Sequence, residues 1–415
     1  MSEPLIGGVG ASGGLGSGVP TSEVPVSDLS AAPAVNAEAD QVGEPAIVAS
    51  AAAGRGPLAM EAVGLNKVFK LGRGTVLQAV RDVSFGLYQG AVVALVGESG
   101  SGKSTVAKLL AGQERPTSGQ VTLDGKPISV HGSRAFRQYK SQVQYVFQDP
   151  FSSLNPVHTV GYHLIRPVKL HSNPPGGRPP VPPGGQSDER QGYRTGPRAR
   201  SADERVMALL EQVRLTPAEQ FVVKYPHELS GGQRQRVSFA RALAAQPTVL
   251  LADEPVSMLD VSIRLEMLNL LDDLRTRLSL ALLYITHDIA SARYFADEVL
   301  VMYGGQIVER GPAEDVTQRP AHPYTQLLIA SAPDPDNLGS SLKAGNVVIG
   351  PGGAIAGKAG NVGPAPVGCP FSNRCPLADD KCRRENPALQ LLTPARAAAC
   401  WHLDVAASPQ ASGSL

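Results

Sequence analysis

A glycine-rich segment directly after a short apolar run constrains the fold of this chain more than any other feature. Residues 91–96 are all apolar, as expected for a strand that is buried on both faces of a parallel sheet. The chain continues with Gly97-Glu98-Ser99-Gly100-Ser101-Gly102-Lys103-Ser104-Thr105 and then with helix-like residues at 106–112. Successive backbone N–H groups in such a turn, together with a helix N-terminus, form a concave set of donors that suits phosphate oxygens. The sequence therefore predicts a strand, a phosphate-binding loop and a helix in succession.

The spacing of this loop is that of the Walker A motif, G-x-x-x-x-G-K-S/T. In that motif the lysine reaches the β- and γ-phosphates and the following hydroxyl ligates Mg²⁺. Lys103 and Ser104 are the residues that we expect to take these two roles. We therefore predict that residues 97–105 bind ATP together with Mg²⁺.

A second apolar strand ends in two acidic residues, Asp253 and Glu254, after Val249-Leu250-Leu251-Ala252. A Walker B strand has this form and brings its carboxylates to the sheet edge beside the phosphate loop. We expect Asp253 to hold the Mg²⁺ shell, and Glu254 to orient and polarise the attacking water.

Strand-like and helix-like segments alternate along the central part of the chain. Residues 59–70 and 76–87 are predicted to be strands on either side of the turn Gly72-Arg73-Gly74. Buried strands are predicted at 249–252 and 281–286, and helices at 201–213 and 263–278. This alternation predicts an α/β architecture, and we find no internal repeat.

Composition divides the chain into parts. Residues 1–56 lack aromatic side chains and are predicted to be a disordered tail, because they cannot bury enough apolar surface to offset the entropy of ordering. Residues 57–330 are assigned to the ATPase domain, with a Pro/Gly-rich insertion at about 172–200. Residues 331–415 form a C-terminal extension that carries all four cysteines.

Charge and hydropathy exclude several classes of protein. The net charge is +1 and no local basic patch stands out, so we expect no nucleic-acid partner. The longest apolar stretches, residues 91–96 and 278–285, are far shorter than the ~20 residues of a membrane-spanning helix. The first residues lack both the basic start and the apolar core of a secretory signal, so we expect residence in the cytoplasm.

The segment Leu229-Ser230-Gly231-Gly232-Gln233-Arg234-Gln235-Arg236 resembles the signature sequence of ABC-type ATPases. Ser230 is expected to cap a helix whose first turn leaves backbone donors and a positive dipole end free for an anion. The resemblance implies a RecA-like core, an antiparallel β subdomain and a helical subdomain. It also implies that Ser230, Gly231, Gly232 and Gln233 contact the γ-phosphate on a second ABC ATPase subunit, so that ATP is sandwiched in a homodimer or heterodimer.

The other elements of this family follow in the expected order. Gln148 resembles the Q-loop glutamine near Mg²⁺, and His287 resembles the switch histidine that contacts the γ-phosphate. Asp260 resembles the D-loop aspartate, although Met258 stands where the family usually has alanine. Phe69 is the expected adenine-stacking residue, where the family more often has tyrosine.

Within this family, residues 58–402 resemble the ATPase subunits of dipeptide, oligopeptide and nickel importers, on Phe147-Gln148-Asp149-Pro150-Phe151-Ser152-Ser153-Leu154-Asn155-Pro156 and His322-Pro323-Tyr324-Thr325. The resemblance implies ATP-driven peptide import at the cytoplasmic face of the membrane, with two permease subunits and an extracytoplasmic binding protein as partners. Import of oligosaccharides or nickel is an alternative. A soluble ABC ATPase acting on ribosomes or DNA is a rival that the single cassette disfavours, and intact Lys103, Glu254 and His287 disfavour a non-hydrolysing cassette.

Cys369, Cys375, Cys382 and Cys400 are close together in the sequence, and the first two are each followed by proline. Because disulfides are disfavoured in a reducing cytoplasm, we interpret the four as a shared metal or cluster site. The spacings lack the close pairs of common zinc knuckles, and four thiolates resemble iron–sulfur ligation. A 4Fe–4S cluster is therefore preferred, and zinc or free buried thiols are the alternatives. Because Lys103 and Ser104 are expected to lie in a separate core, nucleotide binding should survive the loss of this site.

Overall fold

The computed structural model describes residues 56–72, 75–128, 134–149, 153–171, 201–331 and 367–406. The predicted tail, apart from residue 56, and the predicted insertion at 172–200 lie outside the described residues. So do residues 332–366 at the start of the predicted extension.

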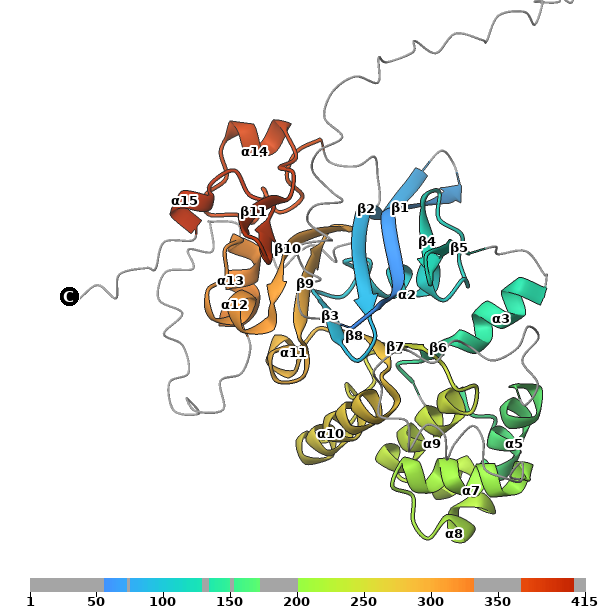
Figure 1. Ribbon diagram of the computed structural model, residues 1–415. Coiled ribbons are helices and arrows are strands. Elements are labelled where there is room, and N and C mark those ends of the chain that lie inside the picture. Colours follow the sequence, from blue (N-terminus) through green and yellow to red (C-terminus); the bar gives the residue numbers. More distant parts are fainter. Residues whose placement is uncertain are drawn as a thin grey trace, which may run out of the picture. The chain divides into compact units, whose positions relative to one another are not determined.

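An eight-stranded sheet forms the centre of the fold, in the order β11-β12-β10-β9-β3-β8-β7-β6 (Figure 1). The strands that pair in parallel are β6 (Val143–Val146), β7 (Val249–Asp253), β8 (Ala281–Thr286), β3 (Val92–Val96) and β9 (Glu298–Tyr303). The antiparallel strands at one side are β10 (Gln306–Pro312), β12 (Arg396–Ala398) and β11 (Gln390–Thr393). The prediction of buried strands at 91–96, 249–252 and 281–286 is confirmed, since every residue of β3, β7 and β8 is buried.

A separate four-stranded antiparallel sheet has the order β2-β1-β4-β5. Its strands are β1 (Leu58–Gly72), β2 (Thr75–Tyr88), β4 (Ser118–Leu123) and β5 (Lys126–Pro127), which confirms the predicted strand pair. Alternate residues of β3 face two hydrophobic cores. Val93 and Leu95 pack with the four-stranded sheet, while Val92, Ala94 and Val96 pack in the cluster that contains most helices.

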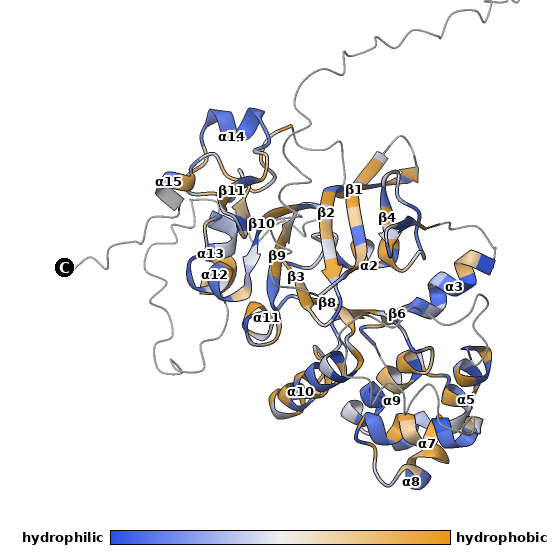
Figure 2. Ribbon diagram, viewed as in Figure 1, coloured by the Kyte–Doolittle hydropathy of each residue, from blue (hydrophilic) through white to orange (hydrophobic). Residues whose placement is uncertain are grey.

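The helices fall into two groups. One group lies beyond strands β6 and β7 in Figure 1. That group contains α5 (Val160–His171), α7 (Ala202–Gln212), α8 (Ala218–Val222), α9 (Gly231–Leu243) and the 3₁₀ helix Pro226–Glu228. The others are α2 (Lys103–Leu110), α3 (Arg134–Gln142), α10 (Val261–Leu278), α11 (Ile289–Phe295), α12 (Ala313–Gln318), α13 (Pro323–Ala330), α14 (Asp380–Arg384) and α15 (Leu403–Ala406). Figure 2 shows apolar and polar residues on opposite faces of α7, as expected for a helix with one buried side.

Two predicted helices match the structure and one is shifted. The helix predicted at 201–213 is α7, which begins after Ser201 with a capping box, and the one predicted at 263–278 is α10. The helix predicted at 106–112 is α2, which runs from Lys103 to Leu110. It ends early because Gly112 adopts φ 61°, a left-handed conformation that terminates helices.

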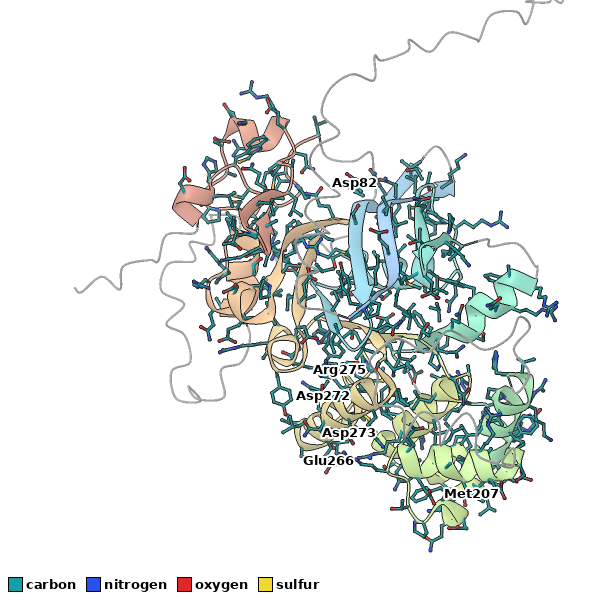
Figure 3. All side chains as sticks on the ribbon, in the orientation of Figure 1. Asp82, Met207, Glu266, Asp272, Asp273 and Arg275 are labelled. Carbon is teal, nitrogen blue, oxygen red and sulfur yellow. The ribbon has the colours of Figure 1, made fainter. Side chains whose placement is uncertain are left out.

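One face of α10 carries charged side chains on the outside of the molecule, where Figure 3 labels Glu266, Asp272, Asp273 and Arg275. Asp272 pairs with Arg275 at 2.7 Å, and Glu266 pairs with Arg236 of α9 at 3.1 Å. Such exposed pairs contribute little to stability, so the buried leucines on the other side of α10 hold it in place. Within the part of the chain that the structure describes, no helix is both long and apolar enough to span a membrane.

The C-terminal extension packs into the main body of the fold. β12 adds to β10, pairing Ala398 with Glu309, and Cys369, Phe371 and Cys382 belong to the same hydrophobic cluster as Val96 of β3. The four-cysteine segment thus packs in one of the two cores beside β3, whereas Val106, Ala107, Leu109 and Leu110 of α2, behind the phosphate loop, pack in the other, in agreement with the expectation of separate cores.

A fully buried carboxylate, Glu309 on β10, joins three parts of this region. It accepts hydrogen bonds from the backbone N–H groups of Ala321 and His322, each at 2.8 Å, and from Arg396 of β12 at 2.8 Å. The carboxylate thus links β10, the start of α13 and the C-terminal extension. A buried charge with several hydrogen bonds of this kind is tolerated only because each oxygen has partners.

Candidate functional site

The glycine-rich loop leaves β3 and enters α2 at Lys103. Glycine is required at two of its positions by close contacts, since a Cβ on Gly97 would lie 2.2 Å from the Met302 carbonyl oxygen. A Cβ on Gly102, which has φ 108°, would lie 2.3 Å from the Ala79 carbonyl oxygen. The loop is therefore packed tightly against β9 and β2.

Lys103 is buried and folds back over the loop. Its Nζ donates to the carbonyl oxygens of Gly97 at 2.7 Å and Glu98 at 2.9 Å. Burial lowers the pKa of Lys103, while the carboxylates of Glu254, Asp253 and Glu98 act in the opposite direction. Lys103 thus lies among acidic groups beside the glycine-rich loop, where ATP phosphates are its expected partners.

Asp253 ends β7 beside this loop, as predicted. Its Oδ1 accepts a hydrogen bond from Ser104 Oγ at 3.2 Å, and its Oδ2 accepts one from Tyr145 Oη at 2.6 Å. Burial and the Asp253 carboxylate both raise the pKa of Tyr145, so this phenol stays a donor. Tyr145 was not among the site residues expected from the sequence. Strand β6 places it next to Asp253 because β6 and β7 pair in parallel.

Three predicted residues are in contact at Glu254, namely Glu254 itself, Gln148 and His287. Its Oε2 lies 2.9 Å from Gln148 Nε2 and 3.2 Å from His287 Nδ1. Glu254 adopts φ 45°, an uncommon conformation for a residue with a side chain, and its N–H donates to the Ile285 carbonyl at 2.9 Å. A carboxylate held between an amide and an imidazole at the end of parallel strands is suited to binding and polarising a water molecule.

The signature residues make local contacts of their own. Ser230 is the N-cap of α9 and forms the predicted cap, with Gln233 N–H donating to Ser230 Oγ at 3.3 Å and Ser230 N–H donating to Gln233 Oε1 at 3.0 Å. Gly232 is closely packed, since a Cβ there would lie 2.9 Å from Ile263 of α10. Asp260 is the N-cap residue of α10. These residues are grouped at the starts of two packed helices, apart from the hydrogen-bonded group around Glu254.

Phe69 lies on β1, opposite Leu77 of β2. Its ring is partly exposed, and Lys67 Nζ lies 4.7 Å from the ring centroid. The ring is thus accessible for stacking, and its contact with adenine stays a prediction.

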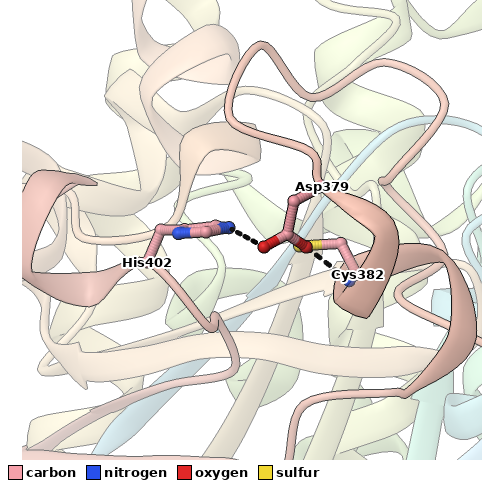
Figure 4. A group of neighbouring side chains, drawn as sticks. All are labelled: Asp379, Cys382 and His402. Atoms are coloured by element: carbon pink, nitrogen blue, oxygen red, sulfur yellow. Dashed lines mark hydrogen bonds and ion pairs between the residues drawn. The ribbon is translucent and has the colours of Figure 1, made fainter.

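The four cysteines line one cavity, together with His322, Phe371, Trp401 and His402 among other residues. All four are free thiols, and Cys369, Cys382 and Cys400 are buried. Asp379, Cys382 and His402 lie at its edge, with ligand atoms all within 4.8 Å of one another (Figure 4). The cavity therefore gathers sulfur donors from three short segments of the extension.

Backbone N–H groups point at these sulfurs. The N–H of His402 lies 3.4 Å from Cys400 Sγ, and backbone hydrogen bonds from Phe371 and Leu377 act to lower the pKa values of Cys369 and Cys375. Burial outweighs them and raises the pKa of each thiol, that of Cys375 to about 11. Buried sulfurs that accept N–H bonds are suited to metal ligation, which replaces the thiol proton by a cation.

An arginine between the first two cysteines reaches the phosphate loop. Arg374 donates to both carboxylate oxygens of Glu98, at 2.9 and 3.0 Å, and Glu98 raises the pKa of the guanidinium. The Glu98 N–H also donates to the hydroxyl of Tyr324 at 2.8 Å. No pattern in the sequence pointed to Arg374. Tyr324 lies in the segment His322-Pro323-Tyr324-Thr325, which was noted only for its resemblance to importer ATPases.

Comparison with known families and proteins agrees with this geometry. The family model described as "ABC transporter" matches residues 80–257, and the one described as "Oligopeptide/dipeptide transporter, C-terminal region" matches residues 308–382. The chain is 38% identical over 337 residues to a putative peptide import ATP-binding protein of Brucella ovis, covering 81% of this chain and 95% of that protein. It is also 38% identical over 330 residues to the di/tripeptide transport ATP-binding protein DppF of Pseudomonas aeruginosa, covering 79% and 91%.

Solved structures show the same fold. The structure of cbiO1 from Clostridium perfringens, described as part of the ABC transporter complex cbiONQ, matches with a TM-score of 0.50 and 26% identity, covering 62% of this chain and 90% of that one. A dimeric ATP-binding cassette in a post-hydrolysis state bound to ADP and Pi also matches with a TM-score of 0.50 and 26% identity, covering 61% and 98%.

Proposed function

Because this chain belongs to the ATP-binding subunits of ABC transporters and is an ABC-type ATPase, we propose that it powers the import of peptides. The support for the cargo is the match of residues 308–382 to the C-terminal region of oligopeptide and dipeptide transporters, together with relatives that are named for peptide import. The main support for ATP hydrolysis is that Glu254 contacts Gln148 and His287 at the end of the parallel strands.

Each residue of that group has a role in the proposed reaction. Lys103 and the N–H groups of residues 97–105 bind the β- and γ-phosphates. Ser104, Asp253 and Gln148 hold Mg²⁺, whose charge helps to neutralise the phosphate oxygens. Glu254 accepts a hydrogen bond from the attacking water and orients it, and His287 contacts the γ-phosphate.

The proposed enzyme works as a dimer. Ser230, Gly231, Gly232, Gln233 and Asp260 lie at helix starts that offer N–H donors, and we assign their phosphate contact to the partner subunit. The dimeric cassette that resembles this chain supports that arrangement. ATP binding then closes the dimer, and hydrolysis reopens it.

We place the chain at the cytoplasmic face of the membrane, on two permease subunits that receive cargo from an extracytoplasmic binding protein. We infer no nucleic-acid partner, because the net charge of +1 provides no basic field. Residues 57–330 are proposed as the ATPase domain and 331–415 as an extension whose strand β12 completes its sheet.

Reconstitution tests the cargo. The protein, co-purified with its genomically adjacent permeases in liposomes, should hydrolyse ATP faster when a peptide-loaded binding protein is added. Stimulation by an oligosaccharide or by Ni²⁺, and not by di- or tripeptides, would reject peptide import and keep the transporter ATPase. Binding to ribosomes or DNA with no permease association would reject the transporter role.

For the four-cysteine cavity we propose a 4Fe–4S cluster. The donor set fits, because four sulfurs that accept backbone N–H bonds line one cavity. The preference for a cluster over zinc rests on the sequence, because the cysteine spacings lack the close pairs of common zinc knuckles. The cluster would supply a covalent link between the three short segments that carry the ligands.

A further inference from the structure

We propose that Arg374 is a positioning residue of the nucleotide site, and that it couples nucleotide binding to the four-cysteine extension. It does so by holding Glu98 in the phosphate-binding loop. The inference rests on the proposed phosphate contacts of residues 97–105, and it does not depend on which cargo is moved or on which metal the cysteines hold.

The first observation is the geometry of the ion pair. The two Nη atoms of Arg374 each donate to a different oxygen of Glu98, which fixes the planes of both groups. The two side chains are 43% and 34% exposed, so charge attraction alone would be screened. The guanidinium also lies 5.8 Å from the ring centroid of Tyr303 and 5.7 Å from that of Phe371. These rings hold the arginine in place and make the contact more than a flexible surface pair.

The second observation is a separate contact to the same loop residue. The backbone N–H of Glu98 donates to the hydroxyl of Tyr324, a buried residue whose ring centroid lies 4.5 Å from that of Tyr303. Tyr324 lies in the first turn of α13, where its N–H donates to Nδ1 of the N-cap His322 at 3.0 Å, and His322 lines the cysteine cavity. Both the side chain and the backbone of Glu98 are therefore held by parts of the fold that border that cavity.

The third observation connects this contact to the phosphates. Lys103 Nζ donates to the carbonyl oxygens of Gly97 and Glu98, so the residue that Arg374 holds also orients the lysine. A displacement of Glu98 changes the position of a group whose work depends on sub-ångström placement. Because linkage is reciprocal, a nucleotide that prefers the held loop must also stabilise the extension that holds it.

The position of Arg374 in the sequence connects it to the four cysteines. It lies between Cys369 and Cys375, and Phe371 of the same segment contributes to the main hydrophobic cluster. A change at the cysteines, by loss of their bound group or by oxidation of a thiol, would shift this segment and release Glu98.

The first test measures nucleotide affinity in the full-length protein. Arg374→Gln should raise the Kd for a fluorescent ATP analogue about three- to tenfold, the effect of losing a well-oriented charged pair. The matched control is Arg293→Gln. Arg293 forms an ion pair with Glu314 at 3.3 Å, and this pair, like that of Arg374 and Glu98, is exposed to solvent. Glu98→Gln should weaken binding by the same factor, and the double variant should be no weaker than either single one. If Arg374→Gln does not fold, Glu98→Gln still tests the contact, because it removes the contact from the loop side.

The second test measures reciprocity by amide hydrogen exchange. A non-hydrolysed ATP analogue with Mg²⁺ should slow exchange in residues 367–384 of the native protein and should not do so in Arg374→Gln. A purely structural arginine would change exchange equally with and without nucleotide. Unchanged Kd in both the Arg374 and Glu98 variants, or an extension that is insensitive to nucleotide, would overturn the proposal. Metal analysis of the same samples separates this result from the cluster, since the coupling is expected whether iron or zinc is found.

Discussion

The proposed catalytic group around Glu254 and the four-cysteine cavity both gather side chains from distant parts of the sequence, but they do so by different means. Glu254, Gln148 and His287 follow parallel strands or lie just beyond them, and the sheet brings such strand ends to one edge. Among the described residues, Cys369, Cys375 and Cys400 lie in irregular segments and Cys382 lies in the one-turn helix α14, and β12 connects the extension to β10 of the sheet. The sheet alone thus determines the first site, whereas the second depends on what its residues bind and contact.

The two regions also differ in how their charges are balanced. Around Glu254 the polar groups are already hydrogen-bonded to one another, and the proposed reaction adds ATP, Mg²⁺, water and the partner subunit. Around the cysteines, burial raises the pKa of each thiol, and the proposed metal or cluster would replace the thiol protons. Loss of a residue should therefore impair chemistry in the first region and order in the second.

The largest effect is expected at Glu254. Glu254→Gln should keep ATP binding and lower turnover at least ~10²-fold, because an amide cannot accept the proton of the attacking water. Phosphate release and equilibrium binding of ATP measure the two parts. Glu266→Gln on the exposed side of α10 is the control. Turnover at the normal rate in Glu254→Gln would mean that another group polarises the water.

The next effect concerns the dimer. Ser230→Arg should abolish ATPase activity and leave the nucleotide affinity of the isolated subunit nearly unchanged, because a bulky cation at the start of α9 blocks closure of the interface. Ser201→Arg is the control, since Ser201 also caps its helix, α7, with a capping box. An equal loss of affinity and activity in Ser230→Arg alone would place its role within one chain.

A smaller effect on chemistry, and a larger one on order, is expected at the cysteines. Protein purified without oxygen should be brown, absorb near ~400 nm and hold about four irons, as expected of a cluster with four Cys ligands. Cys375→Ser or Cys382→Ser should remove the iron and lower the Tm, while Ser372→Ala, in the same cavity, should keep both. Colourless protein with one zinc would reject the cluster, and stable metal-free protein would reject any metal.

The smallest effect is expected at Tyr145. Tyr145→Phe removes the 2.6 Å hydrogen bond to Asp253 and should raise the KM for Mg²⁺–ATP about three- to tenfold, in line with the ~1 kcal/mol that a typical hydrogen bond contributes. Tyr294→Phe, which removes an exposed 2.9 Å bond to Asn269, is the control. Equal KM values for the native protein and Tyr145→Phe would show that Tyr145 only packs.

These differences also explain how much the sequence could predict. The strands and the cap at Ser230 were predictable from local patterns, whereas Gln148 and His287 were expected near the γ-phosphate site of Glu254 from the resemblance to ABC-type ATPases. Tyr145 was not, because its contact depends on the register between β6 and β7, in which Tyr145 pairs with Leu251.

Arg374 shows the same limit more strongly. Its partner Glu98 lies far away in the sequence, and no spacing rule connects the two. The end of α2 was misplaced for a local reason, since Gly112 takes a left-handed conformation that composition alone does not reveal. Long-range contacts of single side chains are thus the part of the site that only the structure provides.

The buried carboxylate of Glu309 has a consequence for any attempt to trim the protein to a minimal cassette. Removal of residues 367–415 would take Arg396 from Glu309 and leave an anion without its cation inside the fold, a change that costs about 3–5 kcal/mol. The same cut would uncover the edge of β10 that β12 now occupies, and open strand edges promote aggregation. Exchange of cassettes between transporters should therefore keep β10, α13 and the cysteine-bearing segment together as a single exchangeable module.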